Sequence, residues 1–270
     1  MAKGLGTVGF LGFGNMGSAI ASGLIARGVL APAAVAAHDP DAGRAAQATA
    51  LGARVVASAA ELAAAADTLV LAVKPQMWRE AAAPLAGALR PGARVVSIMA
   101  GVSIASLRAV LGEQARVIRV MPNTPAMVGA GAAGIAPGPG CDADDADAAR
   151  TMFEAVGEAE IVAEADLDAV TALSGSGPAY FFYLVECLVN AAVAEGLEPA
   201  VAQRLAVQTA LGAGRLLAES GEPAATLREK VTSKGGTTFA ALEAFRGRDF
   251  EGTIAQGVRA AAARSRELGA

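Results

Sequence analysis

A glycine-rich turn near the start of the chain, residues 12–17 with the sequence GFGNMG, limits the possible fold more than any other feature. It follows an apolar run at 7–11 that is typical of a buried strand, and it precedes a helix-like stretch that begins at its end, 16–27. A strand, a G-x-G-x-x-G turn and a helix in this order form the first unit of a dinucleotide-binding sheet. A glycine-rich turn without a ligand is the alternative. The pattern favours a cofactor site and predicts that the pyrophosphate is bound by Gly12, Phe13, Gly14, Asn15, Met16 and Gly17.

Apolar runs alternate with helix-like stretches as far as residue 165. The runs are continuously apolar, which is typical of strands whose two faces are both covered by helices. This repeated order predicts a doubly wound parallel sheet with right-handed crossovers. The expected strands are 7–11, 33–37, 54–57, 68–73, 94–98, 117–121 and 159–162, with a break at 136–140. The expected helices are 16–27, 41–51, 59–65, 103–111 and one that begins near Asp142, Asp144 and Asp145 and runs toward Phe153.

From residue 166 onward the pattern is helical, without a convincing strand. The expected helices are 178–195, 199–220, 223–231, 237–245 and 250–267, three of which have a proline at their start. A length of 270 residues also favours two domains. The predicted fold is therefore α/β: a Rossmann-type dinucleotide-binding domain over 1–165, followed by an all-helical domain for dimerisation and substrate binding over 166–270.

Charge and residue usage narrow the class of ligand. The net charge of −4 gives no basic surface for nucleic acid or anionic membrane, so a small-molecule substrate is expected. The apolar stretch 179–194 is shorter than a membrane span, and no leader is evident, so we expect a cytoplasmic protein. Two distant cysteines, Cys141 and Cys187, and a single histidine, His38, favour neither a disulfide framework nor a metal site.

Asp39 lies about where a residue that contacts the adenosine ribose is expected, at the end of the second strand. A carboxylate there binds the ribose hydroxyls and repels a 2′-phosphate, which favours NADH. Two alternatives stay open, because Arg44 one helical turn on is suited to a phosphate and Asp39 is also suited to cap the next helix. The expected cofactor is thus NADPH or NADH, with a lean to NADH. After the fourth strand, the stretch of Ala72, Val73, Lys74 and Pro75 is expected to line the same crevice.

Several motifs together resemble the pyrroline-5-carboxylate reductase family. The matching stretches are GFLGFGNMG at 9–17, LAVKPQ at 71–76, VSIMAGV at 96–102, VIRVMPNTP at 117–125, LSGSGPAY at 173–180 and VTSKGGTTFAAL at 231–242. The first is generic for dinucleotide binders, whereas the last two are much more specific. The resemblance implies a Rossmann domain and a helical domain that interlocks with its partner. It also implies an obligate homodimer, often assembled into a decamer, with an active site built from both subunits.

By the same resemblance, the substrate is a small cyclic imine with a carboxylate, reduced to proline in the last step of proline biosynthesis. Ser233, Gly236 and Thr237 are expected to bind the carboxylate, and Thr238 to hydrogen-bond the ring nitrogen as the catalytic residue. An ordinary turn with a threonine cap is the alternative. Lys234 stands where many relatives have proline, which adds charge and backbone freedom to this turn.

Residues near the expected nicotinamide complete the predicted site. Ser176 is expected either to supply a hydroxyl to the pocket or to cap the helix that follows it. Asn123, after the sixth strand, is expected to hydrogen-bond the cofactor. Ala100 and Gly101, after the fifth strand, leave room for the ring.

Other enzyme classes fit less well. A 2-hydroxy-acid dehydrogenase usually needs a histidine acid, and the β-hydroxyacid enzymes of similar build need a lysine after the Rossmann domain. His38 lies near the adenosine end, and no lysine occurs between Lys74 and Lys230. A protonated imine is already electrophilic, so its reduction needs positioning more than a strong acid. A nucleotide-sensing module without turnover remains the non-enzymatic alternative.

Overall fold

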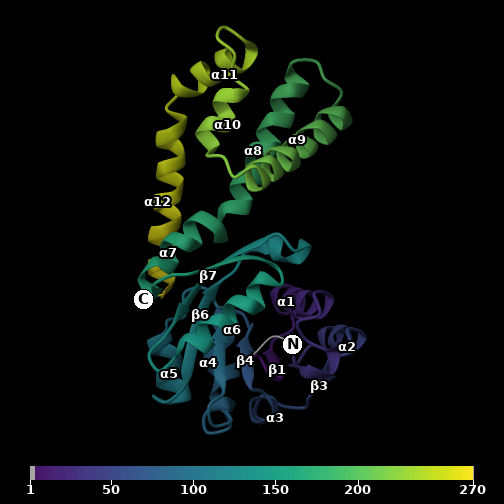
Figure 1. Cartoon of the computed structure of the whole chain (residues 1–270), viewed down its shortest axis with the longest axis vertical. Coiled ribbons are helices and arrows are strands. Elements are labelled where there is room, and N and C mark those ends of the chain that lie inside the picture. Colours follow the sequence, from purple (N-terminus) through teal and green to yellow (C-terminus); the bar gives the residue numbers. More distant parts are fainter. Residues whose placement is uncertain (1–3, 270) are drawn as a thin grey trace. The chain divides into compact units, whose positions relative to one another are not determined.

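The computed structural model of the protein describes residues 4–269. Its first part is built on an eight-stranded sheet in the order β3-β2-β1-β4-β5-β6-β7-β8 (Figure 1). Strands β3, β2, β1, β4, β5 and β6 pair with one another in parallel, and the strand order changes direction between β1 and β4. Ligands of such sheets bind at this switch point, beyond the carboxyl ends of the strands. The parallel strands are β1 (Val8–Leu11), β2 (Val35–His38), β3 (Arg54–Val55), β4 (Thr68–Leu71), β5 (Arg94–Ser97) and β6 (Arg116–Met121), all overlapping the predicted runs.

Strand β7 (Gly131–Pro137) was not predicted. It runs antiparallel to β6 and parallel to the edge strand β8 (Gly157–Ile161), so this edge differs from the parallel arrangement that the sequence favoured. Its residues are mainly glycine and alanine, which have low strand propensity. Pairing with a neighbour on each side stabilises it instead. The predicted break therefore begins only at the end of this strand.

Helices cover both faces of the sheet, as predicted. Adjacent residues of β1, Phe10 and Leu11, belong to different core clusters because successive strand side chains point to opposite faces. The Phe10 cluster is covered by α1 (Asn15–Ala26), α2 (Ala42–Ala50) and α6 (Ala143–Glu154), and the Leu11 cluster by α3 (Ala59–Ala65), α4 (Trp78–Ala82) and α5 (Ile104–Leu111). Short 3₁₀ turns join these elements: η1 (Pro32–Ala34), η2 (Pro75–Met77), η3 (Ala83–Leu85) and η4 (Thr124–Val128).

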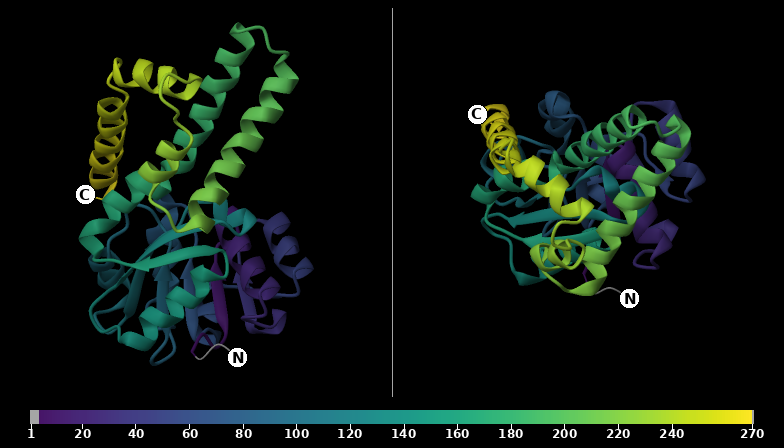
Figure 2. Two further views of the ribbon diagram at one scale, coloured as in Figure 1. Left: turned by 45° about the horizontal axis from the view of Figure 1, so that its top comes forward. Right: turned by 90° about the horizontal axis from the view of Figure 1, so that it is seen from above.

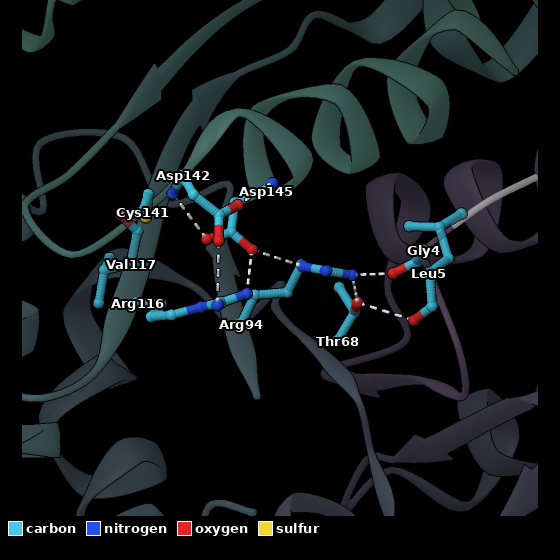
Figure 3. Close-up of polar contacts among 9 residues, drawn as sticks. All are labelled: Gly4, Leu5, Thr68, Arg94, Arg116, Val117, Cys141, Asp142 and Asp145. Carbon is cyan, nitrogen blue, oxygen red and sulfur yellow. Dashed lines mark hydrogen bonds and ion pairs between the residues drawn. The ribbon is translucent and has the colours of Figure 1, made fainter. Parts of the chain in front are cut away.

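A buried carboxylate ties α6 to the middle of the sheet (Figure 3). Asp142 caps the helix, and the side chain of Asp145 returns the hydrogen bond to the Asp142 N–H, so the predicted acidic start of this helix is confirmed. Asp145 is fully buried and also accepts from Arg94 Nε at 3.0 Å and from Arg116. Arg94 in turn donates to Thr68 Oγ1 at 3.2 Å. Asp145 thus links the start of α6 directly to β5 and β6, and through Arg94 to β4.

The second part of the chain is helical, as predicted. Its long helices α8 and α9 lie side by side and run in opposite directions (Figure 2). Their faces carry many exposed apolar side chains, for example Phe182 and Leu211. The helices are α8 (Gly177–Ala194), α9 (Pro199–Ser220), α10 (Ala224–Lys230), α11 (Thr237–Arg246) and α12 (Phe250–Gly269).

The two compact units meet in sequence at Ser176 and Gly177, whereas the sequence analysis placed the domain boundary at 165–166. The difference arises because η5 (Glu164–Asp166), α7 (Leu167–Val170) and the π-helical turn η6 (Thr171–Gly175) belong to the first unit. Val170 packs so closely on β7 that its Cγ1 lies 2.9 Å from where a Cβ on Gly134 would be. The end of the chain from Ala261 also returns to this unit, where the Ser265 hydroxyl donates to Asp168 Oδ1 at 2.6 Å.

The helical run Glu164–Ala194 is long and apolar enough to cross a membrane by length and composition, with a mean hydropathy of 1.3 in its most apolar window. It is longer than the stretch 179–194 that the sequence suggested, because the helix begins earlier. A single such helix is weak evidence for a membrane, since apolar helices at protein interfaces have the same composition.

Candidate active site

A cleft of about 950 Å³ lies at the carboxyl ends of five adjacent parallel strands in the first unit. The residues that follow β3, β2, β1, β4 and β5 line this cleft, which is the arrangement expected at a topological switch point. The cleft brings together ten of the predicted cofactor residues: Gly12, Gly14, Asn15, Met16, Asp39, Ala72, Val73, Lys74, Pro75 and Ala100.

The first glycine of the turn has a backbone conformation that other residues rarely adopt. Gly12 has φ +91°, and a Cβ there would lie 2.8 Å from the carbonyl oxygen of Ala72. Its N–H donates to the carbonyl oxygen of His38 at 2.9 Å, which holds the turn after β1 against the end of β2. At Gly17, which does not line the cleft, a Cβ would lie 2.7 Å from the Gly12 carbonyl oxygen, so the helix can approach the turn only without a side chain.

The start of α1 suits an anion. Its N-cap, Gly14, has no side chain that could satisfy the first N–H groups of the helix. Exposed N–H groups and the positive end of the helix dipole together favour a phosphate. Phe13, which does not line the cleft, is buried and packs edge-on against Phe10, with 6.0 Å between ring centroids, so it anchors the turn. These residues fit the pyrophosphate of a dinucleotide.

Asp39 supports the same turn from the end of β2. Its Oδ2 accepts from the Phe13 N–H at 2.7 Å, and its Oδ1 accepts from the Asp41 N–H at 3.0 Å. Arg44 Nη1 lies 3.7 Å from the carboxylate and 3.0 Å from where a Cβ on Gly14 would be. Asp41, and not Asp39, caps α2. The guanidinium and the carboxylate therefore both lie beside the glycine turn, where an adenosine phosphate and ribose would compete for them.

One wall of the cleft was missed by the sequence analysis. It consists of Ala57, Ser58, Ala59 and Ala60 after β3, with Met77 and Pro84 from the segment after β4. The strand order would have revealed the first group, because β3 lies next to β2 and its carboxyl end falls at the same edge. The sequence alone did not give that order.

Two residues expected near the nicotinamide do not line the cleft. Gly101 packs against the end of α12 within the first unit, since a Cβ there would lie 2.9 Å from the Leu268 carbonyl oxygen. Asn123 is 8% exposed, and both ends of its amide are bonded inside the protein. Its Oδ1 accepts from the Ala132 N–H at 2.8 Å, and its Nδ2 donates to the Ser174 carbonyl oxygen at 2.9 Å. A contact of either residue with the cofactor stays a prediction.

Ser176 follows the π-helical turn and has helical backbone angles, φ −84° and ψ −21°. Its N–H donates to the Thr171 carbonyl oxygen at 2.8 Å, which closes the π-helical turn. An N-cap usually has an extended backbone, so these angles do not favour the capping alternative.

The turn with the predicted substrate residues lies in the second unit, before α11. Gly236 is the N-cap of this helix and provides no side-chain cap, while Gly235 has φ +75°. Thr237 and Thr238 are the first two helical residues, so the alternative of a threonine cap is wrong. Ser233 accepts the Gly236 N–H at its carbonyl oxygen, 3.0 Å away, and its Oγ lies 2.5 Å from where a Cβ on Gly236 would be. The turn thus places the Ser233 hydroxyl beside the N-cap of a helix whose first two residues are threonines.

The single histidine and the two cysteines lie outside the predicted cofactor contacts, although His38 lines the cleft. His38 Nδ1 is 3.1 Å from the Val56 carbonyl oxygen, which fixes the ring. Cys141 and Cys187 are both free, and burial raises the pKa of the Cys141 thiol above its usual value. Among residues 4–269 there is no group of three or more histidine, cysteine or acidic residues that could hold a metal.

Comparisons with known proteins agree with this arrangement. The family model for pyrroline-5-carboxylate reductase dimerisation matches residues 164–268, and that for NADP oxidoreductase, coenzyme F420-dependent, matches residues 7–101. A pyrroline-5-carboxylate reductase of Pseudomonas aeruginosa is 44% identical over 97% of this chain and 96% of that protein. The structure of a pyrroline-5-carboxylate reductase from Coxiella burnetii has a TM-score of 0.95 and 33% identity over 99% of this chain and all of the other. A Plasmodium falciparum pyrroline carboxylate reductase with NADP bound has a TM-score of 0.86 and 28% identity, covering 99% of both chains. The chain belongs to the pyrroline-5-carboxylate reductase family.

Proposed function

We propose that this protein is an NAD(P)H-dependent reductase of the C=N bond in 1-pyrroline-5-carboxylate, and that its product is L-proline. The single observation that carries the proposal is the end-to-end similarity to reductases of this name, from the glycine turn to the last helix. A reduced nicotinamide supplies a hydride to the imine carbon, and one proton is taken up at nitrogen. The chain itself binds, orients and desolvates the reactants.

Cofactor binding is assigned to the cleft of the first unit. The α1 N-terminus and the exposed Lys74 supply positive charge for the pyrophosphate. Asp39 would accept hydrogen bonds from the adenosine ribose, and its negative charge opposes a 2′-phosphate, which supports a lean toward NADH. Arg44 opposes that lean, because the same guanidinium would pair with the phosphate of NADPH.

Substrate binding is assigned to the turn before α11. Gly236 caps this helix without a side chain and the Thr237 N–H follows it, so an anion such as the substrate carboxylate is stabilised at this helix start, while the Gly236 N–H itself is bonded to Ser233. The Ser233 hydroxyl is close enough to the same glycine to join them. Thr238 would hydrogen-bond the ring nitrogen, and Ser176 would contribute a second hydroxyl to the pocket.

No strong acid is required of the protein. A protonated imine is already electrophilic at carbon, so the barrier is lowered mainly by holding the reactants in line and away from water. The single histidine, His38, lies at the end of β2, where its ring contacts the Val56 carbonyl oxygen, and the proposal gives it no role as an acid. A β-hydroxyacid dehydrogenase would need a lysine from the segment 75–229, which contains none.

Assembly and location complete the proposal. The match to the dimerisation model, together with exposed apolar side chains along α8 and α9, supports a homodimer through the helical unit. We propose further assembly into a decamer, by analogy with the family, and a cytoplasmic location.

The test is turnover by the purified protein. 1-Pyrroline-5-carboxylate is mixed with NADH and NADPH in separate reactions, and loss of absorbance at the nicotinamide band is followed while proline is measured. Oxidation coupled to one proline per cofactor supports the proposal. Cofactor binding without oxidation of either cofactor would instead favour the nucleotide-sensing alternative.

A further inference from the structure

The carbonyl group of Ser174 lacks the partner that a regular helix would give it. The residue four positions later is Pro178, which has no N–H and whose ring presses on the carbonyl of residue i−4. Pro178 is the second residue of α8, so its predicted place at a helix start is confirmed, and α8 continues the helical run Glu164–Ala194. The run adapts by the π-helical turn Thr171–Gly175 just before it. Such turns occur frequently at functional sites.

Asn123 supplies a donor to that carbonyl. Its Nδ2 lies 2.9 Å from the Ser174 oxygen, and its Oδ1 takes the Ala132 N–H at 2.8 Å. Asparagine is among the best N-cap residues, yet this one precedes η4 without capping it. Only a side chain with both a donor and an acceptor satisfies the two backbone groups, and a carboxylate of the same length cannot donate.

The same turn also rests on the last residue of β6. Gly175 lies against the side chain of Met121, since a Cβ on Gly175 would lie 2.6 Å from Met121 Cε. Met121 and Asn123 therefore hold the π-helical turn at the carboxyl end of β6, the edge of the sheet along which the cofactor cleft lies. Ser176 directly follows this turn.

We propose that Asn123 is a positioning residue of the reductase: it provides the hydrogen bond that Pro178 cannot, and thereby fixes the turn that presents Ser176 to the substrate. The inference rests on the proposed function and differs from the expectation that Asn123 binds the cofactor. In this proposal the Asn123 amide bonds to backbone groups of the protein and not to the cofactor. It affects the rate through the position of Ser176, since a displacement of about 1 Å near reacting groups can lower a rate by about 100-fold.

The test uses the full-length protein and three variants. Asn123→Asp keeps the acceptor for Ala132 and loses the donor to Ser174. Pro178→Ala restores an N–H four residues after Ser174, and the double variant asks whether that N–H replaces the amide. Gln47→Glu makes the same amide-to-carboxylate change at an exposed site of α2 and is the matched control.

We expect Asn123→Asp to lower kcat by about 10- to 100-fold, while the Kd of the reduced cofactor, measured by its fluorescence, stays within about twofold. The double variant should recover most of the loss, and Gln47→Glu should match the wild type. A rise of cofactor Kd parallel to the fall in kcat would overturn the proposal, because Asn123 would then be a cofactor ligand. A double variant no more active than Asn123→Asp would also overturn it.

A second measurement is independent of turnover. Amide hydrogen exchange at Ala132 should be slow in the wild type and in Asn123→Asp, and fast in Asn123→Ala, which loses the acceptor. Unchanged protection in Asn123→Ala would contradict the hydrogen bond itself. If the wild type does not reduce 1-pyrroline-5-carboxylate, the proposed function fails in the first assay, and the exchange experiment still decides whether the Asn123 side chain accepts the hydrogen bond from Ala132.

Discussion

Asp39 makes two kinds of interaction at the end of β2, and a single substitution can separate them. The side chain accepts a hydrogen bond from Phe13 and carries a negative charge into the cleft. An asparagine at this position would keep an acceptor for the N–H and remove the charge. We therefore expect Asp39→Asn to raise the ratio of kcat/KM for NADPH to that for NADH by about fivefold or more, because a negative charge about 4 Å from a phosphate costs at least about 1 kcal/mol.

The control for Asp39→Asn is a variant that loses a negative charge far from the expected adenosine site. Asp67→Asn serves as the control, since Asp67 lies before β4 and pairs with Arg90. Kinetics with both cofactors should leave its NADPH to NADH ratio unchanged. An Asp39→Asn enzyme with an unaltered ratio would show that Arg44 and not Asp39 sets the preference.

Thr238 is expected to act on the rate and not on cofactor affinity. Removal of one hydrogen bond to the reacting nitrogen, in Thr238→Ala, should lower kcat by about 10- to 100-fold, since such donors are aimed at charge that changes during the reaction. Thr238→Ser keeps the hydroxyl and should restore most of the rate. Steady-state kinetics and cofactor titration check both. Loss of cofactor binding in Thr238→Ala would contradict its assignment to the substrate.

Ser233 should give the opposite kinetic pattern. If it binds the carboxylate in the ground state and the transition state alike, Ser233→Ala raises KM for the imine with little change in kcat. The two variants together divide the turn into a part that binds the substrate and a part that acts on the reacting bond.

Helix α6 depends on a carboxylate that no solvent reaches. Asp145→Asn would leave Arg94, itself 11% exposed at its side chain, without a full counter-charge in the sheet. We expect the free energy of unfolding to fall by about 3–5 kcal/mol, the usual effect of removing one partner of a buried ion pair. Urea titration followed by circular dichroism measures the change.

Asp144 provides the matched control for this helix. It lies one residue earlier in the first turn and is exposed, so Asp144→Asn loses only its interaction with the helix dipole, about 0.3–1 kcal/mol. Equal destabilisation by the two variants would mean that the helix charge, and not the tie to Arg94 and Arg116, stabilises the unit.

At the level of elements, the sequence predicted what local patterns encode. The parallel strands, the capped helices and the glycine turn each depend on residues close together in the chain, such as Asp142 and Asp145 at the start of α6. Strand β7 could not be predicted, because its alanines and glycines form a strand only when β6 and β8 pair with it. The hydrogen bond from Asn123 to Ser174 spans 51 residues, so no local signal could reveal it.

For the whole chain, assembly is expected to depend on the helical unit. Phe182 on α8 is 68% exposed in a single chain, and an arginine there would introduce an unpaired charge into the proposed dimer contact. We expect Phe182→Arg to weaken the dimer by about 2 kcal/mol or more, a rise in Kd of about 30-fold. Sedimentation equilibrium across protein concentrations measures it.

Gln47→Arg adds the same charge to α2, which belongs to the sheet unit and is exposed. It should sediment as the wild type does. A Phe182→Arg protein that remains fully dimeric would locate the contact elsewhere on the helices, and a dimer weakened equally by Gln47→Arg would implicate the sheet unit.

The order of the sheet also determines which surfaces are protected from unwanted association. An open edge exposes unpaired backbone groups that can recruit a strand from another molecule. Here one edge, β3, is only two residues long, and the other, β8, has Glu158 and Glu160 exposed on either side of the buried Ala159. A second sheet approaching β8 would meet carboxylates, and one approaching β3 would find too little backbone to pair with. Both edge strands thus disfavour edge-to-edge pairing with another molecule, even though the strands between them are among the most apolar parts of the chain.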